Sequence, residues 1–134
     1  MRYLRIAAAL FAVALVVPGF AKESFKLMNA EELSKLIDQK SPDLFIFDAN
    51  GSSTRESEGV IPGAHLLSSY RGYDVASELP KKKDAKLVFY CANTQCMASH
   101  AAAERATEAG YNDVNVMADG IMGWSAAGKS VAKP

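Results

Sequence analysis

Residues 86–110 decide the fold, and they read KLVFYCANTQCMASHAAAERATEAG. The apolar run Leu87–Tyr90 predicts a buried strand, and the Ala-rich segment 98–109 predicts a helix that stops at Gly110. Between them lies a short polar loop that begins with Cys91. A cysteine in that place has its sulfur facing backbone N–H groups and a helix N-terminus, which favour a thiolate and bind anionic groups. The stretch therefore predicts a reactive-thiol site at Cys91.

Strands and helices alternate along the rest of the chain. Asn29 and Glu32 have the spacing of a capping box, which predicts a helix running to about Gln39. Leu44–Asp48 is a continuous apolar run that ends in an acid, as in a central parallel strand buried on both faces. The alternation predicts an α/β fold with a mostly parallel sheet covered by helices on both faces. The other expected elements are an edge strand at Ser24–Leu27, a helical turn near Arg55–Ser57, a strand at His65–Leu67, an irregular or weakly helical stretch at Tyr70–Leu79, a strand at Val114–Met117, a turn into a short helix over Asp119–Trp124, and a loosely attached tail from Gly128.

The composition is that of an ordinary globular domain. Apolar residues make up 49% of the chain and charged residues 22%, and the formal net charge is zero. A chain without excess positive charge offers no electrostatic surface for nucleic acid, so no nucleic-acid partner is expected. The two cysteines, Cys91 and Cys96, lie in one loop, which points to chemistry or to a local bridge rather than to a disulfide framework.

The N-terminal segment has the pattern of a secretory signal peptide. Arg2 and Arg5 precede the apolar run Ile6–Val17, and the small residues Gly19 and Ala21 follow it. That run is shorter than a membrane span and fits the apolar region of a signal peptide. We therefore expect residues 1–21 to be removed after Ala21, leaving a domain at residues 22–134 in the periplasm or outside the cell. No stable membrane association is expected after cleavage, and an uncleaved N-terminal anchor is the alternative.

Four motifs in their order along the chain resemble one family. They are Asp48 at the end of a strand, the turn Gly59–Ala64, the strand-terminal Phe89-Tyr90-Cys91 and the segment Asp119–Trp124. With these motifs the chain resembles the single-domain rhodanese-like sulfurtransferases from about Asn29 to Gly128. The resemblance implies a three-layer α/β/α fold around a mostly parallel sheet of about five strands.

The resemblance also implies a mechanism. Cys91 would be the catalytic nucleophile, would take a sulfane sulfur from a small donor such as thiosulfate as a persulfide, and would pass it to a thiol or cyanide acceptor. No cofactor or metal ion is needed. Asp48 and Ser99 are supporting residues, Asp48 through backbone N–H groups or as a strand cap and Ser99 through its hydroxyl. The persulfide would be held by the backbone N–H groups of the following residues, which are Ala92, Asn93, Thr94, Gln95, Cys96 and Met97.

The site departs from the common pattern of the family at several positions. The last loop residue, often arginine, is Cys96, and the residue two after the strand-end aspartate, also often arginine, is Asn50. Two cations that bind an anionic donor are thus absent from their usual places, where Arg55 or Arg71 could substitute. Thr94 stands for a common glycine and Val60 for a common histidine. Phosphatases of this fold end a longer loop in arginine, where this chain has Met97, which disfavours phosphatase chemistry.

Several interpretations of the cysteines stay open. Cys91 is a nucleophile or a buried structural thiol. Cys96 is an inert thiol, a resolving cysteine or half of a disulfide with Cys91. These alternatives lead to three interpretations of the function, which are a sulfurtransferase, a non-catalytic binding or sulfur-carrier module, and a thiol–disulfide redox protein that uses Cys91 and Cys96. A Cu(I) site made by both cysteines and Met97 with His65 or His100 is the least favoured interpretation.

Overall fold

The computed structural model of the protein describes residues 24–134, so the predicted signal peptide lies outside the described residues. A five-stranded sheet in the order β1-β5-β4-β2-β3, with every pair parallel, forms the centre of the molecule. This arrangement confirms the predicted α/β class and the mostly parallel sheet. The elements are β1 Lys26–Met28, α1 Ala30–Asp38, β2 Leu44–Asp48, α2 Ser52–Glu58, β3 His65–Leu66, α3 Val75–Glu78, β4 Lys86–Tyr90, α4 Ala98–Glu108, β5 Asp113–Met117 and α5 Gly120–Ala126.

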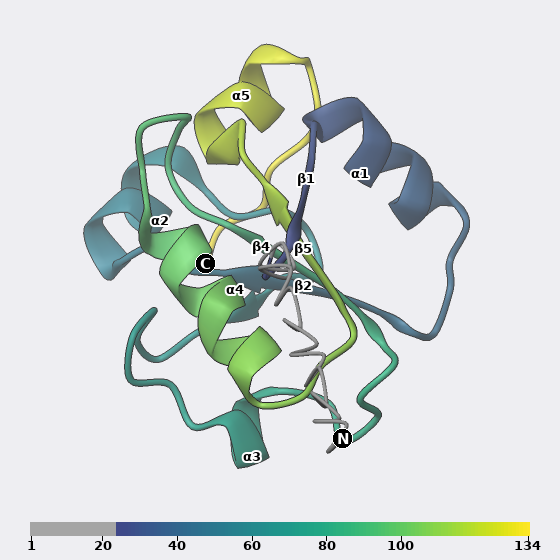
Figure 1. The fold of residues 1–134 in the computed structure, drawn as a ribbon. Coiled ribbons are helices and arrows are strands. Elements are labelled where there is room, and N and C mark those ends of the chain that lie inside the picture. Colours follow the sequence, from purple (N-terminus) through teal and green to yellow (C-terminus); the bar gives the residue numbers. More distant parts are fainter. Residues whose placement is uncertain (1–23) are drawn as a thin grey trace, which may run out of the picture.

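The central strand β4 contributes to a hydrophobic core on each face of the sheet. Because side chains alternate along a strand, Leu87, Phe89 and Cys91 point to one face and Val88 and Tyr90 to the other. The first set packs with α3 and α4, and the second with α1 and α5, so helices cover both faces (Figure 1). All five side chains are almost fully buried. The same alternation that builds the core therefore places the Cys91 sulfur on the α4 side.

Helix α1 begins with the capping box that the sequence predicts. The Asn29 side chain accepts the Glu32 amide at 2.8 Å, and the Glu32 carboxylate accepts the Asn29 amide at 2.8 Å. A third acceptor comes from far along the chain, since Asp119 Oδ2 accepts the Ala30 amide at 2.8 Å. Asp119 thereby ties the start of α5 to the start of α1 at the carboxyl edge of the sheet.

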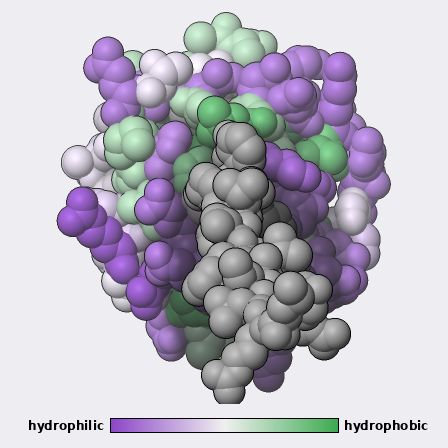
Figure 2. Space-filling view, in the orientation of Figure 1, coloured by the Kyte–Doolittle hydropathy of each residue, from purple (hydrophilic) through white to green (hydrophobic). Residues whose placement is uncertain are grey.

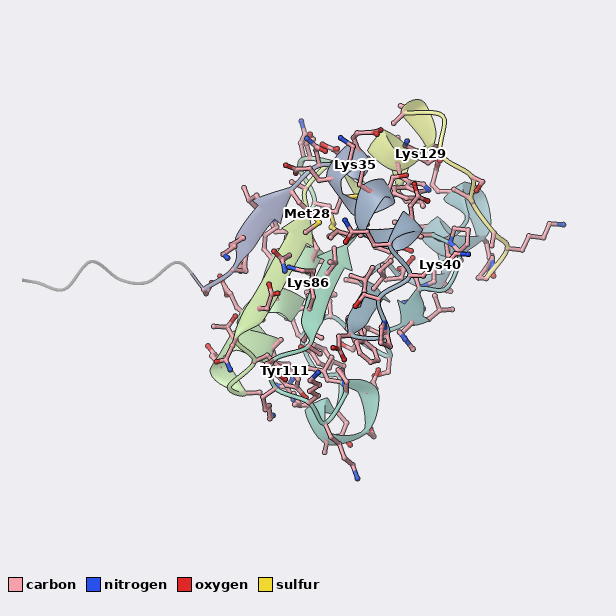
Figure 3. All side chains as sticks on the ribbon, turned by 90° about the vertical axis from the view of Figure 1, so that its right-hand side faces the viewer. Met28, Lys35, Lys40, Lys86, Tyr111 and Lys129 are labelled. Carbon is pink, nitrogen blue, oxygen red and sulfur yellow. A yellow bond between two sulfur atoms is a disulfide. The ribbon has the colours of Figure 1, made fainter. Side chains whose placement is uncertain are left out.

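The C-terminal tail is attached, so the expectation of a loose tail from Gly128 is wrong. Trp124 Nε1 donates to the Ser130 carbonyl at 2.9 Å, and Val60 and Ala132 exchange two backbone hydrogen bonds. Lys129 Nζ lies 2.8 Å from a Glu31 carboxylate oxygen, and Figure 3 shows Lys129 on the α1 side of the molecule. Val60 and Glu31 lie far from the tail in sequence, so the residues of the tail alone do not predict these two contacts.

The surface is mixed in polarity. Figure 2 shows one face, on which hydrophilic residues surround small separate apolar areas. Within residues 24–134 no helix combines the length and the apolar character that crossing a bilayer requires.

Candidate active site

Cys91 lies immediately after β4 at the carboxyl edge of the sheet and is 1% exposed. Helix α5 fixes the backbone here, because the Ile121 amide donates to the Cys91 carbonyl at 2.8 Å and the Met122 amide donates to the Ala92 carbonyl at 3.0 Å. Gly120 permits this approach, since its φ is +68° and a Cβ there would overlap the backbone of Ala92. Gly120 of the predicted Asp119–Trp124 motif therefore allows α5 to bind the start of the cysteine loop, residues 91–97.

The loop then turns back on itself through Asn93. The Asn93 carbonyl accepts the Cys96 amide at 3.2 Å, and its side-chain oxygen accepts the Gln95 amide at 3.0 Å. This turn returns the chain toward β4 and brings the Cα atom of Cys96 to 6.3 Å from that of Cys91. The two cysteines are joined by a disulfide bond. Of the alternatives for Cys96, the local disulfide is the state that the structure contains.

Ser99 is a polar residue next to the Cys91 sulfur. Its hydroxyl oxygen lies 3.3 Å from Cys91 Sγ, and the residue is 2% exposed in the first turn of α4. A disulfide sulfur carries no proton, so the hydroxyl is the donor in this pair. The helix has no side-chain cap at Met97, which leaves its first amides directed at the loop. Donors of this kind stabilise a thiolate once the disulfide is open.

Two of the loop amides expected to hold a persulfide are occupied within the loop. The Gln95 and Cys96 amides both donate to Asn93, as described above. Within residues 24–134 the amides of Thr94 and Met97 have no acceptor. Asn93, Thr94, Gln95 and Met97 are exposed, while Ala92 and Cys96 are partly buried. Among the described residues the loop therefore keeps backbone donors without an acceptor at residues that are exposed.

Asp48 is the central acceptor of a buried hydrogen-bond network beside the loop. Its Oδ1 accepts the Asn50 amide at 2.8 Å and pairs with Arg55 Nε at 3.1 Å, and its Oδ2 accepts the Tyr90 hydroxyl at 2.6 Å. The Tyr90 hydroxyl oxygen in turn accepts the Ile61 amide at 3.0 Å. These contacts fix the segment after β2, and the Asp48 carboxylate makes no hydrogen bond to residues 92–97. Burial, with the Asp48 carboxylate adding to it, raises the pKa of Tyr90.

The two candidate cations fall in different places. Arg55 is committed to the network, because its Nη2 also donates to the carbonyls of Asp48 at 3.0 Å and Leu67 at 2.9 Å. Arg71 is exposed and lines a hollow of about 350 Å³ at the start of α4. Tyr70, Met97, His100 and Glu104 also line this hollow. Arg71 is therefore the arginine that adjoins the cysteine loop, and Glu104 opposes its charge.

Asn50, in the position where the family often has arginine, is buried at 8% exposure. It follows Ala49, whose amide donates to the Tyr90 carbonyl at 2.9 Å, so Asn50 lies at the same sheet edge as Cys91. Its Nδ2 has no acceptor within the described residues. A buried donor without an acceptor lowers the free energy of unfolding by about 1–3 kcal/mol. In this respect the Asn50 side chain differs from its neighbour Asp48, whose carboxylate oxygens both accept hydrogen bonds.

The two histidines of the copper interpretation pack against phenylalanine rings. His65 stacks near Phe45 and Phe47, and His100 meets the edge of Phe25. Among residues 24–134 no three side chains of His, Cys, Asp or Glu gather as a metal-binding group.

Comparison with known proteins decides the family. A family model described as Rhodanese-like domain matches residues 29–127. The chain belongs to the rhodanese-like family. Comparison with curated proteins finds no match. The fold is similar to that of the BH2092 protein from Bacillus halodurans, with a TM-score of 0.69 and 18% identity over 81% of this chain and 77% of that one.

Two further solved structures resemble this rhodanese-like chain. A protein from Rhodopseudomonas palustris described as a possible tyrosine phosphatase is 25% identical, with a TM-score of 0.66, over 81% of this chain and 86% of that one. A thiosulfate sulfurtransferase from Pseudomonas aeruginosa is 23% identical, with a TM-score of 0.65, over 81% of this chain and 20% of that one. These likenesses agree with the family assignment and with the layered fold.

The sequence did not reveal the Tyr90 hydroxyl as part of this rhodanese-like site. Tyr90 ends an apolar strand, a position that predicts only a core residue, yet its hydroxyl joins Asp48 to the Ile61 amide. A tyrosine at the same sheet position as a strand-end aspartate is the signal that could have found it, because β2 and β4 pair Asp48 with Tyr90.

Proposed function

We propose that this rhodanese-like protein is an exported sulfurtransferase in which Cys91 takes a sulfane sulfur from a small anionic donor and delivers it to a thiol or cyanide acceptor. The observation that carries the proposal is the place of Cys91. Its Sγ lies at the carboxyl end of the central strand, beside the Ser99 hydroxyl and the start of α4, and it is bonded there to a second sulfur atom. Because the Cys96 sulfur fits next to Cys91 Sγ, there is room at the same place for a sulfur taken from a donor.

With thiosulfate as donor the chemistry is a displacement at sulfur. The Cys91 thiolate attacks the outer sulfur of thiosulfate, a new S–S bond forms, and sulfite leaves with the electron pair of the broken bond. Cyanide or a thiolate then attacks the outer sulfur of the persulfide and returns Cys91 to a thiolate. Donors near Cys91 Sγ stabilise the charge that each sulfur carries as it leaves.

The disulfide sets the resting state of this reaction. A sulfur in the Cys91–Cys96 bond is not a nucleophile, so the enzyme acts only after reduction. Export to an oxidising compartment, which residues 1–21 predict, would keep the bond closed until a reductant arrives. N-terminal sequencing of the exported protein tests this part, since a mature chain that still begins at Met1 or Arg2 contradicts cleavage.

The hollow at the start of α4 is the proposed binding place of the donor. Arg71 provides the positive charge there, in place of the arginines that many family members have at the positions of Asn50 and Cys96. Glu104 in the same hollow weakens the attraction for anions, so we expect a modest affinity for thiosulfate.

The experiment that tests the proposal is a steady-state assay of thiocyanate formation from thiosulfate and cyanide by reduced protein. We expect turnover by Cys96→Ser, in which no second thiol lies beside the persulfide, and none by Cys91→Ser. Equal rates for both would overturn the proposal. Absence of turnover with any sulfane donor, while both thiols remain free, would favour the non-catalytic binding module.

A thiol–disulfide redox protein is the second candidate, and the disulfide itself favours it. In that case the pair exchanges electrons with a partner dithiol, and no sulfur is transferred. A Cys91–Cys96 pair that equilibrates with glutathione but forms no persulfide with thiosulfate would support this candidate.

A further inference from the structure

We propose that Cys96 resolves the Cys91 persulfide, releasing the transferred sulfur as hydrosulfide and closing the Cys91–Cys96 disulfide, and that a dithiol reductant reopens the site by attacking the Cys96 sulfur. The proposal rests on the persulfide of the proposed function. It makes the second cysteine the built-in acceptor of the sulfurtransferase and makes its product hydrosulfide.

The loop holds the two sulfurs together by contacts that do not depend on the disulfide. The Asn93 turn binds the amides of Gln95 and Cys96, and α5 binds the carbonyls of Cys91 and Ala92. None of these hydrogen bonds involves a sulfur atom, so reduction of the disulfide does not itself remove any of them. Cys96 then stays next to Cys91 at a high effective concentration, which an external thiol does not match.

The step balances in atoms and electrons. The Cys96 thiolate attacks Cys91 Sγ, the inner sulfur of the persulfide, and the S–S bond to the outer sulfur breaks. The outer sulfur leaves as hydrosulfide with the electron pair of that bond. The two cysteine sulfurs are oxidised to a disulfide and the sulfane sulfur is reduced. Attack at the inner sulfur is the direction that the structure supports, since Cys96 Sγ is bonded directly to Cys91 Sγ.

The burial of the two sulfurs decides where the reductant attacks. Cys91 is 1% exposed, whereas Cys96 is partly buried and lies between the exposed Gln95 and Met97. A dithiol therefore reaches Cys96 Sγ and forms a mixed disulfide there, and Cys91 leaves as a thiolate beside the Ser99 hydroxyl. The second thiol of the reductant then displaces Cys96, which completes the transfer of two electrons. Each reduction regenerates the nucleophile directly.

The test uses reduced, desalted protein under nitrogen with about one equivalent of thiosulfate and no added thiol. We expect the wild-type chain to release about one equivalent of hydrosulfide and to lose about 2 Da as its disulfide closes. Cys96→Ser should release none and should gain about 32 Da on Cys91, and Cys96→Ala should behave in the same way. Peptide mapping assigns the modified residue in each case.

Failure of this inference and failure of the proposed function give different results. A wild-type chain that keeps the added sulfur and releases hydrosulfide only after an external thiol is added overturns the inference and leaves the sulfurtransferase. A disulfide that closes without matching hydrosulfide also overturns it. Absence of the added mass from both Cys96 variants overturns the proposed function.

The site of reduction has its own test. Oxidised protein is treated with glutathione, quenched with acid and mapped by mass spectrometry. We expect glutathione on Cys96 and a free Cys91, and glutathione on Cys91 would contradict the assigned direction of attack.

Discussion

The hydroxyl oxygen of Ser99 lies 3.3 Å from the sulfur of Cys91. The two residues come from different elements, the end of β4 and the first turn of α4, and both are almost fully buried. In the reduced protein this pair gives the Cys91 thiolate a donor inside the core, where water does not replace it. The contact therefore links the packing of α4 on the sheet to the reactivity of the thiol.

Removing this donor should slow the thiol chemistry. A hydrogen bond to a charged group contributes about 1.5–3 kcal/mol, so Ser99→Ala should reduce the rate of Cys91 alkylation at neutral pH by about tenfold or more. Alkylation by iodoacetamide of the reduced Cys96→Ser protein measures it. The exposed Ser125→Ala is the matched control and should leave the rate unchanged. Equal rates for Ser99→Ala and Ser125→Ala would show that the hydroxyl does not stabilise the thiolate.

Gly120 should be intolerant of a side chain. Gly120→Ala places a Cβ against the backbone of Ala92 and Asn93 at a φ of +68°, and a cost of about 3 kcal/mol or more in the free energy of unfolding is expected. Gly128→Ala is the matched control, because its φ is +77° but no atom lies within 4 Å of the added Cβ. Denaturant unfolding of the two variants should separate the cost of a side chain at positive φ, which both share, from the cost of steric overlap with the loop, which only Gly120→Ala has. A loss for Gly120→Ala no larger than that for Gly128→Ala contradicts the close approach of α5 to the loop.

The buried tyrosines should make the protein sensitive to alkaline pH. Burial raises the pKa of both Tyr73 and Tyr90 above the ordinary value near 10, so the folded state keeps both protons where the unfolded state loses them. Stability is then fully present below about pH 10 and falls as pH rises further, by about 1.4 kcal/mol per pH unit for each tyrosine.

Replacing one tyrosine should reduce that slope. Unfolding free energy measured from pH 8 to 11 should fall less steeply for Tyr73→Phe, whose lost hydroxyl donates to the Ala102 carbonyl at 2.7 Å. The exposed Tyr70→Phe is the control and should keep the wild-type slope. A wild-type slope in Tyr73→Phe would contradict the shifted titration.

The charges of the hollow should act in opposite directions on an anionic donor. Arg71→Gln should raise the KM for thiosulfate several-fold, and Glu104→Gln should lower it, because the two side chains line the same hollow with opposite charge. Both effects should shrink as ionic strength rises. Steady-state kinetics at low and high salt measures them. Unchanged KM values in both variants would move the donor site elsewhere.

Local patterns carried most of the fold. The apolar runs of β2 and β4, the capping box at Asn29 and the stop at Gly110 depend on neighbours within a few residues, and each lies where the sequence predicts it. Strand boundaries at the edges of the sheet moved by one or two residues, as for β1 and β3. Edge strands have fewer buried positions, so their pattern is weaker.

The remaining features depend on contacts that only the folded chain makes. Nothing local to Arg55 distinguishes a donor-binding arginine from the partner of Asp48, and only the folded sheet places its guanidinium against that carboxylate. The attached tail depends on Val60, which lies far from its partner Ala132 in the sequence. For Cys96 the spacing allowed an inert thiol, a resolving cysteine or a disulfide, and the Asn93 turn is what brings the sulfurs together.

The intact mass of reduced Cys96→Ser protein after anaerobic incubation with thiosulfate is the direct test of sulfur transfer to Cys91. We expect a gain of about 32 Da that maps to Cys91 and disappears when cyanide is added, with formation of thiocyanate. An unchanged mass, with Cys91 still free to react with iodoacetamide, would contradict it.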